Sequence, residues 1–216
     1  MRWVHVICIG AATVLSACGI GAEFPDFTAK QYRLAGSRTI PGAELSGRAV
    51  YYRDDERLRY EGVLEEHGVA TVIYDPAREA AYLLNSSGQS RRAFAGAQAR
   101  PLALALDEGE APQPLETAWS ALGPANVRAV GRCRVAGERG VLWRTREPVG
   151  PDIVRTACIT RDGIVLRLME NETTLFEAIS LSRGSQPAHL FVIPETYRIV
   201  DDAELARAEE ETPPGG

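Results

Sequence analysis

Apolar and charged residues alternate with a period of two along this chain, and the alternation is clearest over residues 57–65. Leu58, Tyr60 and Leu64 share one side of an extended backbone there, and charged residues occupy the other side. Half-buried strands of antiparallel sheets have this pattern, because one face packs on a core and the other meets water. We therefore predict that Leu58, Tyr60 and Leu64 point inward. The side chains expected to point to solvent are those of Arg57, Arg59 and Glu61.

Similar alternation, separated by turn-forming residues, predicts a series of short strands joined as antiparallel hairpins. Besides 57–65, we expect strands at 47–53, 69–74, 80–84, 91–95, 127–135, 140–146, 153–160, 164–169 and 175–181. Two strand groups flank one helix at 115–122, where apolar residues have helical spacing and Gly123-Pro124 follows. The sequence predicts a mainly β (α+β) fold. We expect a curved antiparallel sheet or half-open barrel of about 10–11 strands, with the helix as a short plug.

The N-terminus has the parts of a secretory signal: Arg2, an apolar run at 3–15, and small residues before Cys18. The run is shorter than the about 20 apolar residues that a transmembrane helix needs. Leu15-Ser16-Ala17-Cys18 resembles the box that bacterial lipoprotein signal peptidase cuts. The resemblance implies removal of residues 1–17 and covalent diacylglycerol and N-acyl chains on Cys18. An ordinary secretory signal that includes a cysteine, or an uncleaved anchor, is the alternative.

Gly19 follows the cysteine where an inner-membrane retention signal of typical Gram-negative bacteria would have Asp. This resemblance implies an outer-membrane lipoprotein that is lipid-anchored and faces the periplasm, with the membrane as its first partner.

Removal of the signal peptide leaves a chain long enough for one core. We expect a lipidated tether at 18–27, a single β domain at 28–200 and a disordered acidic tail at 201–216, which is rich in Ala and Glu. At the start of the mature chain, we predict a short helix over 24–31.

Four cysteines sort by position: Cys8 lies in the signal peptide, Cys18 takes the lipid, and Cys133 and Cys158 remain. In an oxidising compartment a remaining pair favours one structural disulfide. A metal site or a redox-active thiol pair is the alternative, but the pair lacks C-x-x-C spacing and nearby histidines. We predict no metal site.

The formal net charge of −5 and the absence of a recognised basic tract argue against nucleic acid as a partner. Attraction to anionic lipid headgroups has no support at this level either. The mature chain has two histidines, His67 and His189, and none of the common catalytic or nucleotide-binding motifs. We therefore predict no catalytic residues, no enzyme activity and no cofactor beyond the acyl chains on Cys18.

Aromatic and apolar side chains are the remaining candidates for a site. They belong either to a filled core or to a cavity that takes an acyl chain. The candidate lining residues are Leu58, Tyr60, Leu64, Trp119 and Trp143. Two functions follow: binding of lipid or another apolar ligand on the concave face, or a structural or protein-interaction role with a filled core.

Two stretches, 47–85 and 157–167, carry strand and turn patterns that include Tyr51-Tyr52-Arg53-Asp54-Asp55 and Arg161-Asp162-Gly163. They resemble uncharacterised envelope proteins related to the LolA/LolB-like lipoprotein-carrier superfamily. The resemblance implies a strongly curved antiparallel sheet around a helical plug, with a concave face that binds acyl chains or other lipids. The shared patterns contain no catalytic residues, so the resemblance assigns no role to an individual residue.

Overall fold

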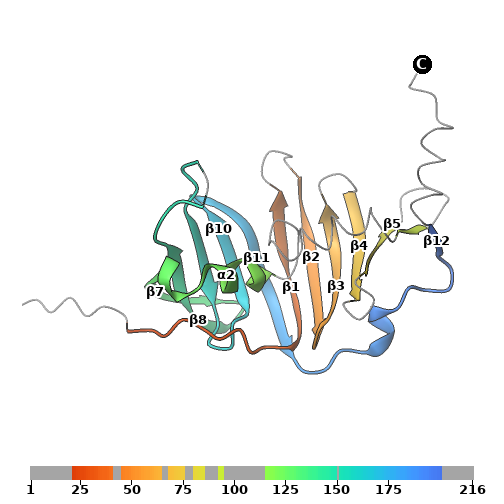
Figure 1. Cartoon of the computed structure of the whole chain (residues 1–216), viewed down its shortest axis with the longest axis horizontal. Coiled ribbons are helices and arrows are strands. Elements are labelled where there is room, and N and C mark those ends of the chain that lie inside the picture. Colours follow the sequence, from red (N-terminus) through yellow and green to blue (C-terminus); the bar gives the residue numbers. More distant parts are fainter. Residues whose placement is uncertain are drawn as a thin grey trace, which may run out of the picture.

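A computed structural model describes residues 21–40, 45–64, 68–75, 80–85, 92–94, 115–149 and 151–200. Within these ranges the chain is mostly β, with one 12-stranded sheet, a short α-helix and short 3-10 helices (Figure 1). No helix in this part of the chain is long and apolar enough to cross a membrane. The signal peptide, Cys18 and the acidic tail lie outside the described residues.

The predicted strands and the predicted helix are present, and their bounds agree with the structure to within two residues. The strands are β1 (Gln31–Ile40), β2 (Leu45–Asp54), β3 (Arg57–Leu64), β4 (Gly68–Asp75), β5 (Ala80–Asn85), β6 (Arg92–Phe94), β7 (Val127–Val135), β8 (Glu138–Thr145), β9 (Arg155–Ile159), β10 (Val165–Glu170), β11 (Thr173–Arg183) and β12 (Arg198–Val200). The helices are α2 (Leu115–Leu122), η2 (Pro124–Asn126) and η3 (Ala188–Phe191).

The strand order is β12-β6-β5-β4-β3-β2-β1-β11-β10-β9-β8-β7, so each group of hairpins keeps its sequence order. All pairings are antiparallel except β12 with β6, which is parallel. The sheet is not closed into a barrel, because its end strands β12 and β7 do not pair. The β7–β11 half curls strongly, and residues of β7 come within 8 Å (Cα–Cα) of residues of β11. The predicted fold class, a curved antiparallel sheet or half-open barrel with a short helical plug, is confirmed, and the sheet has 12 strands where about 10–11 were predicted.

Strand β1, which joins the two halves of the sheet, was not predicted. It pairs with β2 on one side and with β11 on the other. The pairing with β11 contains a β-bulge between Ala35 and Gly36, which interrupts the period of two. A Cβ on Gly36 would lie 2.3 Å from the carbonyl oxygen of Glu177, so only glycine permits this approach.

The predicted helix at 24–31 is wrong. Residues 21–30 have no regular structure, and Gln31 already begins β1. Phe27 has a φ of 52°, which lies outside the α region, and the Ala29 amide donates to the Asp162 carbonyl. The rings of Phe24 and Phe27 pack against each other from this irregular backbone.

One hydrophobic core runs through both halves and includes α2. Trp119 of α2 is 0% exposed and belongs to the same cluster as Tyr60 and Trp143. On the opposite face of the sheet, Ile73 and Tyr82 form a smaller cluster that the segment after η3 covers. Each face of the β3–β5 region is therefore packed.

That second layer corrects the prediction for β3. Leu58 and Tyr60 are buried as predicted, whereas the side chain of Leu64 lies outside the described residues. Arg57 and Glu61 are partly exposed, but Arg59 does not simply point to solvent. Its guanidinium donates to the Leu190 carbonyl at 2.9 Å, because η3 lies against this face.

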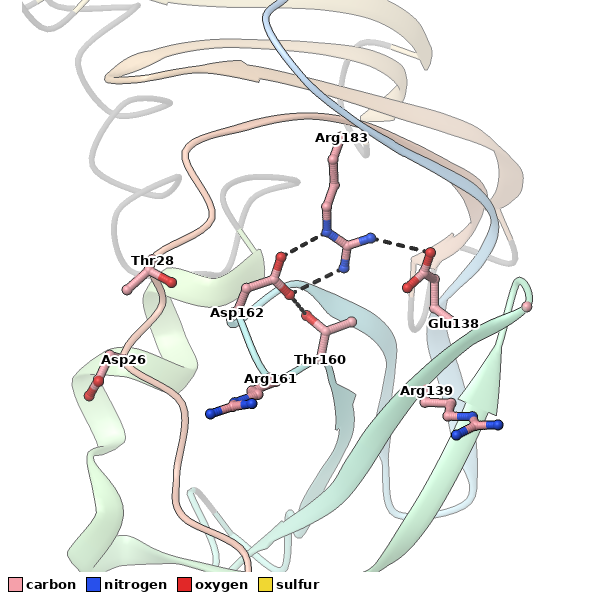
Figure 2. A pocket seen from close by; sticks show the side chains of 9 residues that line it. Asp26, Thr28, Glu138, Arg139, Thr160, Arg161, Asp162 and Arg183 are labelled. Atoms are coloured by element: carbon pink, nitrogen blue, oxygen red, sulfur yellow. Dashed lines mark hydrogen bonds and ion pairs between the residues drawn. The ribbon is translucent and has the colours of Figure 1, made fainter.

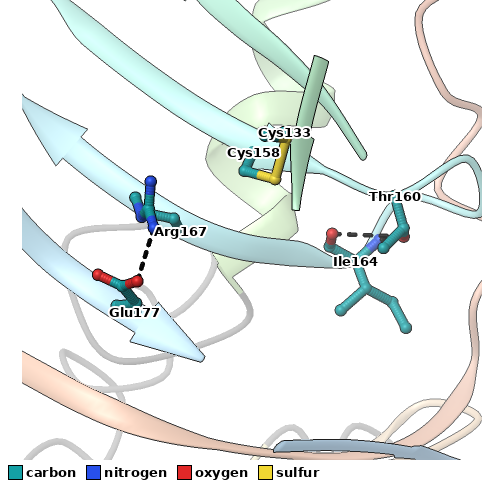
Figure 3. Close-up of a disulfide and its surroundings, with 6 residues drawn as sticks. All are labelled: Cys133, Cys158, Thr160, Ile164, Arg167 and Glu177. Carbon is teal, nitrogen blue, oxygen red and sulfur yellow. Dashed lines mark hydrogen bonds and ion pairs between the residues drawn. A yellow bond between two sulfur atoms is a disulfide. The ribbon is translucent and has the colours of Figure 1, made fainter. Parts of the chain in front are cut away.

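The disulfide between Cys133 of β7 and Cys158 of β9 crosses the intervening strand β8 (Figure 3). The two Cα atoms lie 6.0 Å apart, inside the range of about 4.4–6.8 Å for disulfides. Gly140 of β8 lies beneath the crossing, and a Cβ there would be 3.1 Å from the Cys133 sulfur and 2.7 Å from the Ile159 carbonyl oxygen. A residue without a side chain at this point lets the disulfide join next-neighbouring strands.

Candidate functional site

The predicted lining residues divide between a filled core and an open pocket. Tyr60 and Trp119 are buried in the core, and neither of them lines any of three pockets that described residues form. Trp143 lines one of these pockets. Trp143 is nevertheless 4% exposed and belongs to the same core cluster as Tyr60 and Trp119, so it lies at the boundary between that core and the pocket.

The concave face near Tyr60 is packed with aromatic rings. The Tyr51 ring lies 5.1 Å from the Tyr60 ring and 5.3 Å from the Phe176 ring, measured between centroids. The Tyr60 hydroxyl donates to the Val63 carbonyl at 2.8 Å. Burial raises the pKa of Tyr51 and of Tyr60, so both phenols stay neutral.

Two buried residues far apart in sequence hold α2 on the sheet. Glu116 of α2 forms an ion pair with Arg53 of β2 and accepts a hydrogen bond from the Tyr32 hydroxyl of β1 at 2.7 Å. Burial opposes the charge on Arg53, but Glu116 outweighs it and the pKa of Arg53 is raised. For Tyr32, burial and then Glu116 raise the pKa of the phenol. No sequence pattern indicated this triad, because only the tertiary structure brings its three residues together.

Asp54, at the end of β2, is buried although it adjoins the β2–β3 turn. The residue is 4% exposed and forms an ion pair with Arg57. It also accepts hydrogen bonds from the Ser185 hydroxyl and the Gln186 amide, each at 3.2 Å. Burial alone would raise the pKa of Asp54, but the hydrogen bonds from Gln186, Arg57 and Ser185 outweigh burial and lower it.

The pocket beside Trp143, which we call the Trp143 pocket, has a volume of about 490 Å³. Its apolar wall includes Trp143, Val141 and Ile159. The N-terminal segment forms the opposite wall, where the Phe24 ring meets the Trp143 ring edge-on with centroids 5.0 Å apart. Its basic residues are Arg132, Arg139 and Arg161, and its acidic residues are Glu23 and Asp26.

A second pocket of about 700 Å³, the Arg183 pocket, adjoins the first and shares Asp26, Arg139, Thr160 and Arg161 with it. Figure 2 shows the Arg183 guanidinium between two carboxylates. It donates to Asp162 at 2.8 and 3.2 Å and pairs with Glu138 at 3.2 Å. Arg183 is therefore occupied by acids of this chain, whereas Arg139 and Arg161 have no hydrogen-bond or ion-pair partner among the described residues.

Asp162 is the structural centre of the Arg183 pocket. Besides Arg183, it accepts a hydrogen bond from the Thr160 hydroxyl at 2.5 Å. Burial favours a higher pKa for Asp162, but the bonds from Arg183 and Thr160 prevail and the pKa is lowered. The hydrogen bond to Asp162 from Arg183 raises the pKa of that arginine. The ion pair with Arg183 and the hydrogen bond from Thr160 together hold the β9–β10 turn.

The β7–β8 hairpin carries a cluster of arginines that the sequence analysis did not recognise. Between residues 127 and 146 the sequence has six arginines and one acid, Glu138. A charge count in a window of this length would have found them. The arginines are Arg128, Arg132, Arg134, Arg139, Arg144 and Arg146, and all six are exposed.

Across the described residues, no group of three or more His, Cys, Asp or Glu side chains is placed to hold a metal ion. The two pockets contain carboxylates as well as guanidinium groups, and of these Arg139 and Arg161 have no acidic partner among the described residues; guanidinium groups favour carboxylates and phosphates. Their apolar neighbours at Trp143 favour a nonpolar group. The arrangement suits a ligand with an apolar part and a negative charge.

Neither a protein-family model nor a curated protein matches the chain. Among solved structures, an uncharacterised conserved protein from Thermus thermophilus is similar, with a TM-score of 0.50 and 11% identity over 81% of this chain and 92% of that chain. MucB in the Pseudomonas aeruginosa MucA/MucB complex gives a TM-score of 0.49 and 15% identity, over 81% of this chain and 59% of the MucB chain. A crystal structure of MucB gives 0.47 and 18%, over 78% and 59%. The likeness to the Thermus protein concerns the fold alone.

Proposed function

We propose that this chain is a non-enzymatic lipoprotein with LolA/LolB-like architecture, anchored through Cys18 in the outer membrane and facing the periplasm. It binds an amphipathic ligand with an acyl chain and an anionic head in the Trp143 pocket. The disulfide fits an oxidising compartment, and the box before Cys18 fits lipidation.

The composition of the wall that the N-terminal segment contributes to the Trp143 pocket supports this proposal. Phe24 places an apolar ring on Trp143, and its neighbours Glu23 and Asp26 line the same pocket as three arginines. The N-terminal segment therefore presents an apolar group flanked by negative charges. An acyl chain with a carboxylate or phosphate head has the same chemistry, and the volume of about 490 Å³ lies in the usual range for ligand sites.

Fatty-acid titration of the chain without residues 1–18 tests ligand binding. Fluorescence of Trp143, which lines the pocket, is expected to change on binding, while Trp119, which does not line it, contributes a constant background. Val141→Phe narrows the pocket and should abolish the change. Val192→Phe is the matched control, because Val192 is 56% exposed and does not line the pocket. No fluorescence change, together with no copurifying lipid by mass spectrometry, would reject acyl-chain binding.

A protein partner is the second candidate, and the packed concave face favours it. Tyr51, Tyr60 and Phe176 are each 1% exposed, so the described core is filled. Moreover, one wall of the Trp143 pocket is a peptide segment, residues 22–26, whose Phe24 packs on Trp143. Binding of an acidic, aromatic peptide but not of fatty acid in the same titration would select this function.

Intact-mass analysis of the protein extracted from membranes tests the anchor separately. The expected mass is that of residues 18–216 plus diacylglycerol and an N-acyl chain. Cys18→Ser should carry no acyl chain. An unmodified wild-type chain would reject the lipoprotein assignment without affecting the pocket.

A further inference from the structure

We propose that the β7–β8 hairpin docks the protein on the membrane by binding the phosphates of anionic phospholipid headgroups. The proposal rests on the lipid anchor of the proposed function. It adds an orientation: the hairpin faces the bilayer, and the β12 end of the sheet points away from it.

The arginines of the hairpin are free to bind anions. Their guanidinium groups have no hydrogen-bond or ion-pair partner among the described residues, and all are exposed. The single acid of the hairpin, Glu138, already pairs with Arg183. Although the whole chain has a formal net charge of −5, the β7–β8 hairpin therefore has a local excess of positive charge.

The register of the hairpin places like charges opposite each other. Arg128 is the cross-strand partner of Arg144, and Arg134 is the partner of Arg139. Directly opposite like charges destabilise a sheet, so this arrangement opposes the folding of the hairpin. A phosphate between the guanidinium groups would remove the repulsion and form the bidentate bonds that arginine favours.

The proposed lipid anchor on Cys18 places a membrane close to these arginines. Gly21 is three residues after Cys18, which limits the distance between their Cα atoms to roughly 10 Å. Ala22 lines the same pocket as Arg132 and Arg139. In Figure 1 the N-terminal segment enters at the β7–β8 end, and β12 lies at the other end. Cys18 thus holds the hairpin within about one or two Debye lengths of the headgroups.

Hydrogen–deuterium exchange of the full lipidated protein in vesicles tests the orientation. Strand β7 is an edge strand that pairs only with β8, so its outward amides exchange readily in solution. Vesicles that contain phosphatidylglycerol should slow exchange in β7 relative to vesicles of phosphatidylcholine alone. High salt should remove the difference, because screening weakens the contact.

Arg134→Glu separates docking from the Trp143 pocket, because Arg134 does not line that pocket. The ratio of docked to undocked protein should fall about fivefold for each unit of positive charge lost near the surface. The same change turns the repulsive pair with Arg139 into an attractive one, so the melting temperature should rise. Arg48→Glu is the matched control: Arg48 is an exposed arginine on β2, and its reversal should leave exchange in β7 unchanged.

Equal exchange in the two kinds of vesicle would overturn the proposal. If phosphatidylglycerol slows exchange in Arg134→Glu as much as in wild type, the proposal is also wrong. The arginines would then serve only to prevent other strands from pairing with the edge strand β7. Protection of β7 that needs other envelope proteins would also overturn the proposal, in favour of an acidic protein surface. Failure of the lipid anchor can be distinguished from failure of hairpin docking, because an unlipidated protein would not remain bound to phosphatidylcholine vesicles.

Discussion

The two halves of the sheet, β2–β6 and β7–β11, are built from the same antiparallel hairpins but are stabilised in different ways. In the first half, the core covers one face of β3–β5 and the C-terminal segment covers the other. In the second half, a disulfide joins β7 to β9 and strong curvature brings β7 near β11. A covalent crosslink can replace a second packed layer, which leaves the second half with open pockets and exposed arginines.

The seam between the halves depends on one strand and one helix. Strand β1 pairs with both halves, and Glu116 attaches α2 to β1 and β2. Since the main core includes residues of both halves and of α2, loss of the seam should affect the whole sheet. Loss of a local feature should affect one half.

Removal of Glu116 should have the largest effect. Glu116→Ala leaves the Arg53 guanidinium buried without its partner, and we expect the free energy of unfolding to fall by about 3–5 kcal/mol. Urea unfolding followed by circular dichroism measures the loss. Glu172→Ala, in the exposed β10–β11 turn, is the control and should change little. A loss confined to one half of the sheet by hydrogen exchange would contradict the role of the seam.

Removal of the disulfide should have the next largest effect. The cysteines are 25 residues apart, and loop-closure entropy for such a loop predicts a loss of about 3 kcal/mol for Cys133→Ser/Cys158→Ser. Exchange should accelerate most in β7–β9 and less in β3–β5. Wild-type protein under reducing conditions is the control and should behave like the double variant. Equal acceleration in both halves would show that the second half does not depend specifically on its crosslink.

Replacement of Asp54 tests how the C-terminal segment is held to the first half. Asp54→Ala leaves the Gln186 amide and the Ser185 hydroxyl without an acceptor, so we expect a loss of about 2 kcal/mol at pH 7. Because the folded pKa of Asp54 is lowered from 3.8, its stabilisation is present above that value and is lost as the pH falls through the folded pKa. The difference between wild type and variant should therefore shrink below about pH 4. Unfolding curves across this pH range measure it, with the exposed Glu147→Ala as control; a constant difference would contradict the assignment.

Shortening Ile73 should have the smallest effect of the four. Ile73→Val removes one methyl group from the outer-face cluster, and the expected loss is about 1 kcal/mol. Exchange should accelerate in β4 and β5 and remain unchanged in β8 and β9. Val69 lies on the same strand but is 68% exposed, so Val69→Ala should stay within about 0.5 kcal/mol of wild type. A similar loss in both variants would show that the outer face of the first half is not a packed layer.

The alternation of apolar and charged residues around Tyr60 predicted β3 and its buried face, because apolar side chains with a period of two mark the side of a strand that is shielded from water. The same signal fails in β1, where Ala35 and Gly36 form a bulge and carry little apolar surface. It also fails for Arg59, whose outward direction is right but whose surface is covered by η3. Of the candidate site, Trp143 was predicted, whereas Phe24 was assigned to a helix and the arginines of the hairpin were overlooked.

The local sequence was enough to predict the antiparallel hairpins, the position of α2 and the pairing of Cys133 with Cys158. These features depend on neighbours in the chain or on a count of one residue type. Only the tertiary structure decided that β1 joins β11, that Glu116 meets Arg53 and that Phe24 lies on Trp143. Those contacts join residues far apart in sequence, and their stability comes from burial and charge pairing that exist only once the sheet has formed.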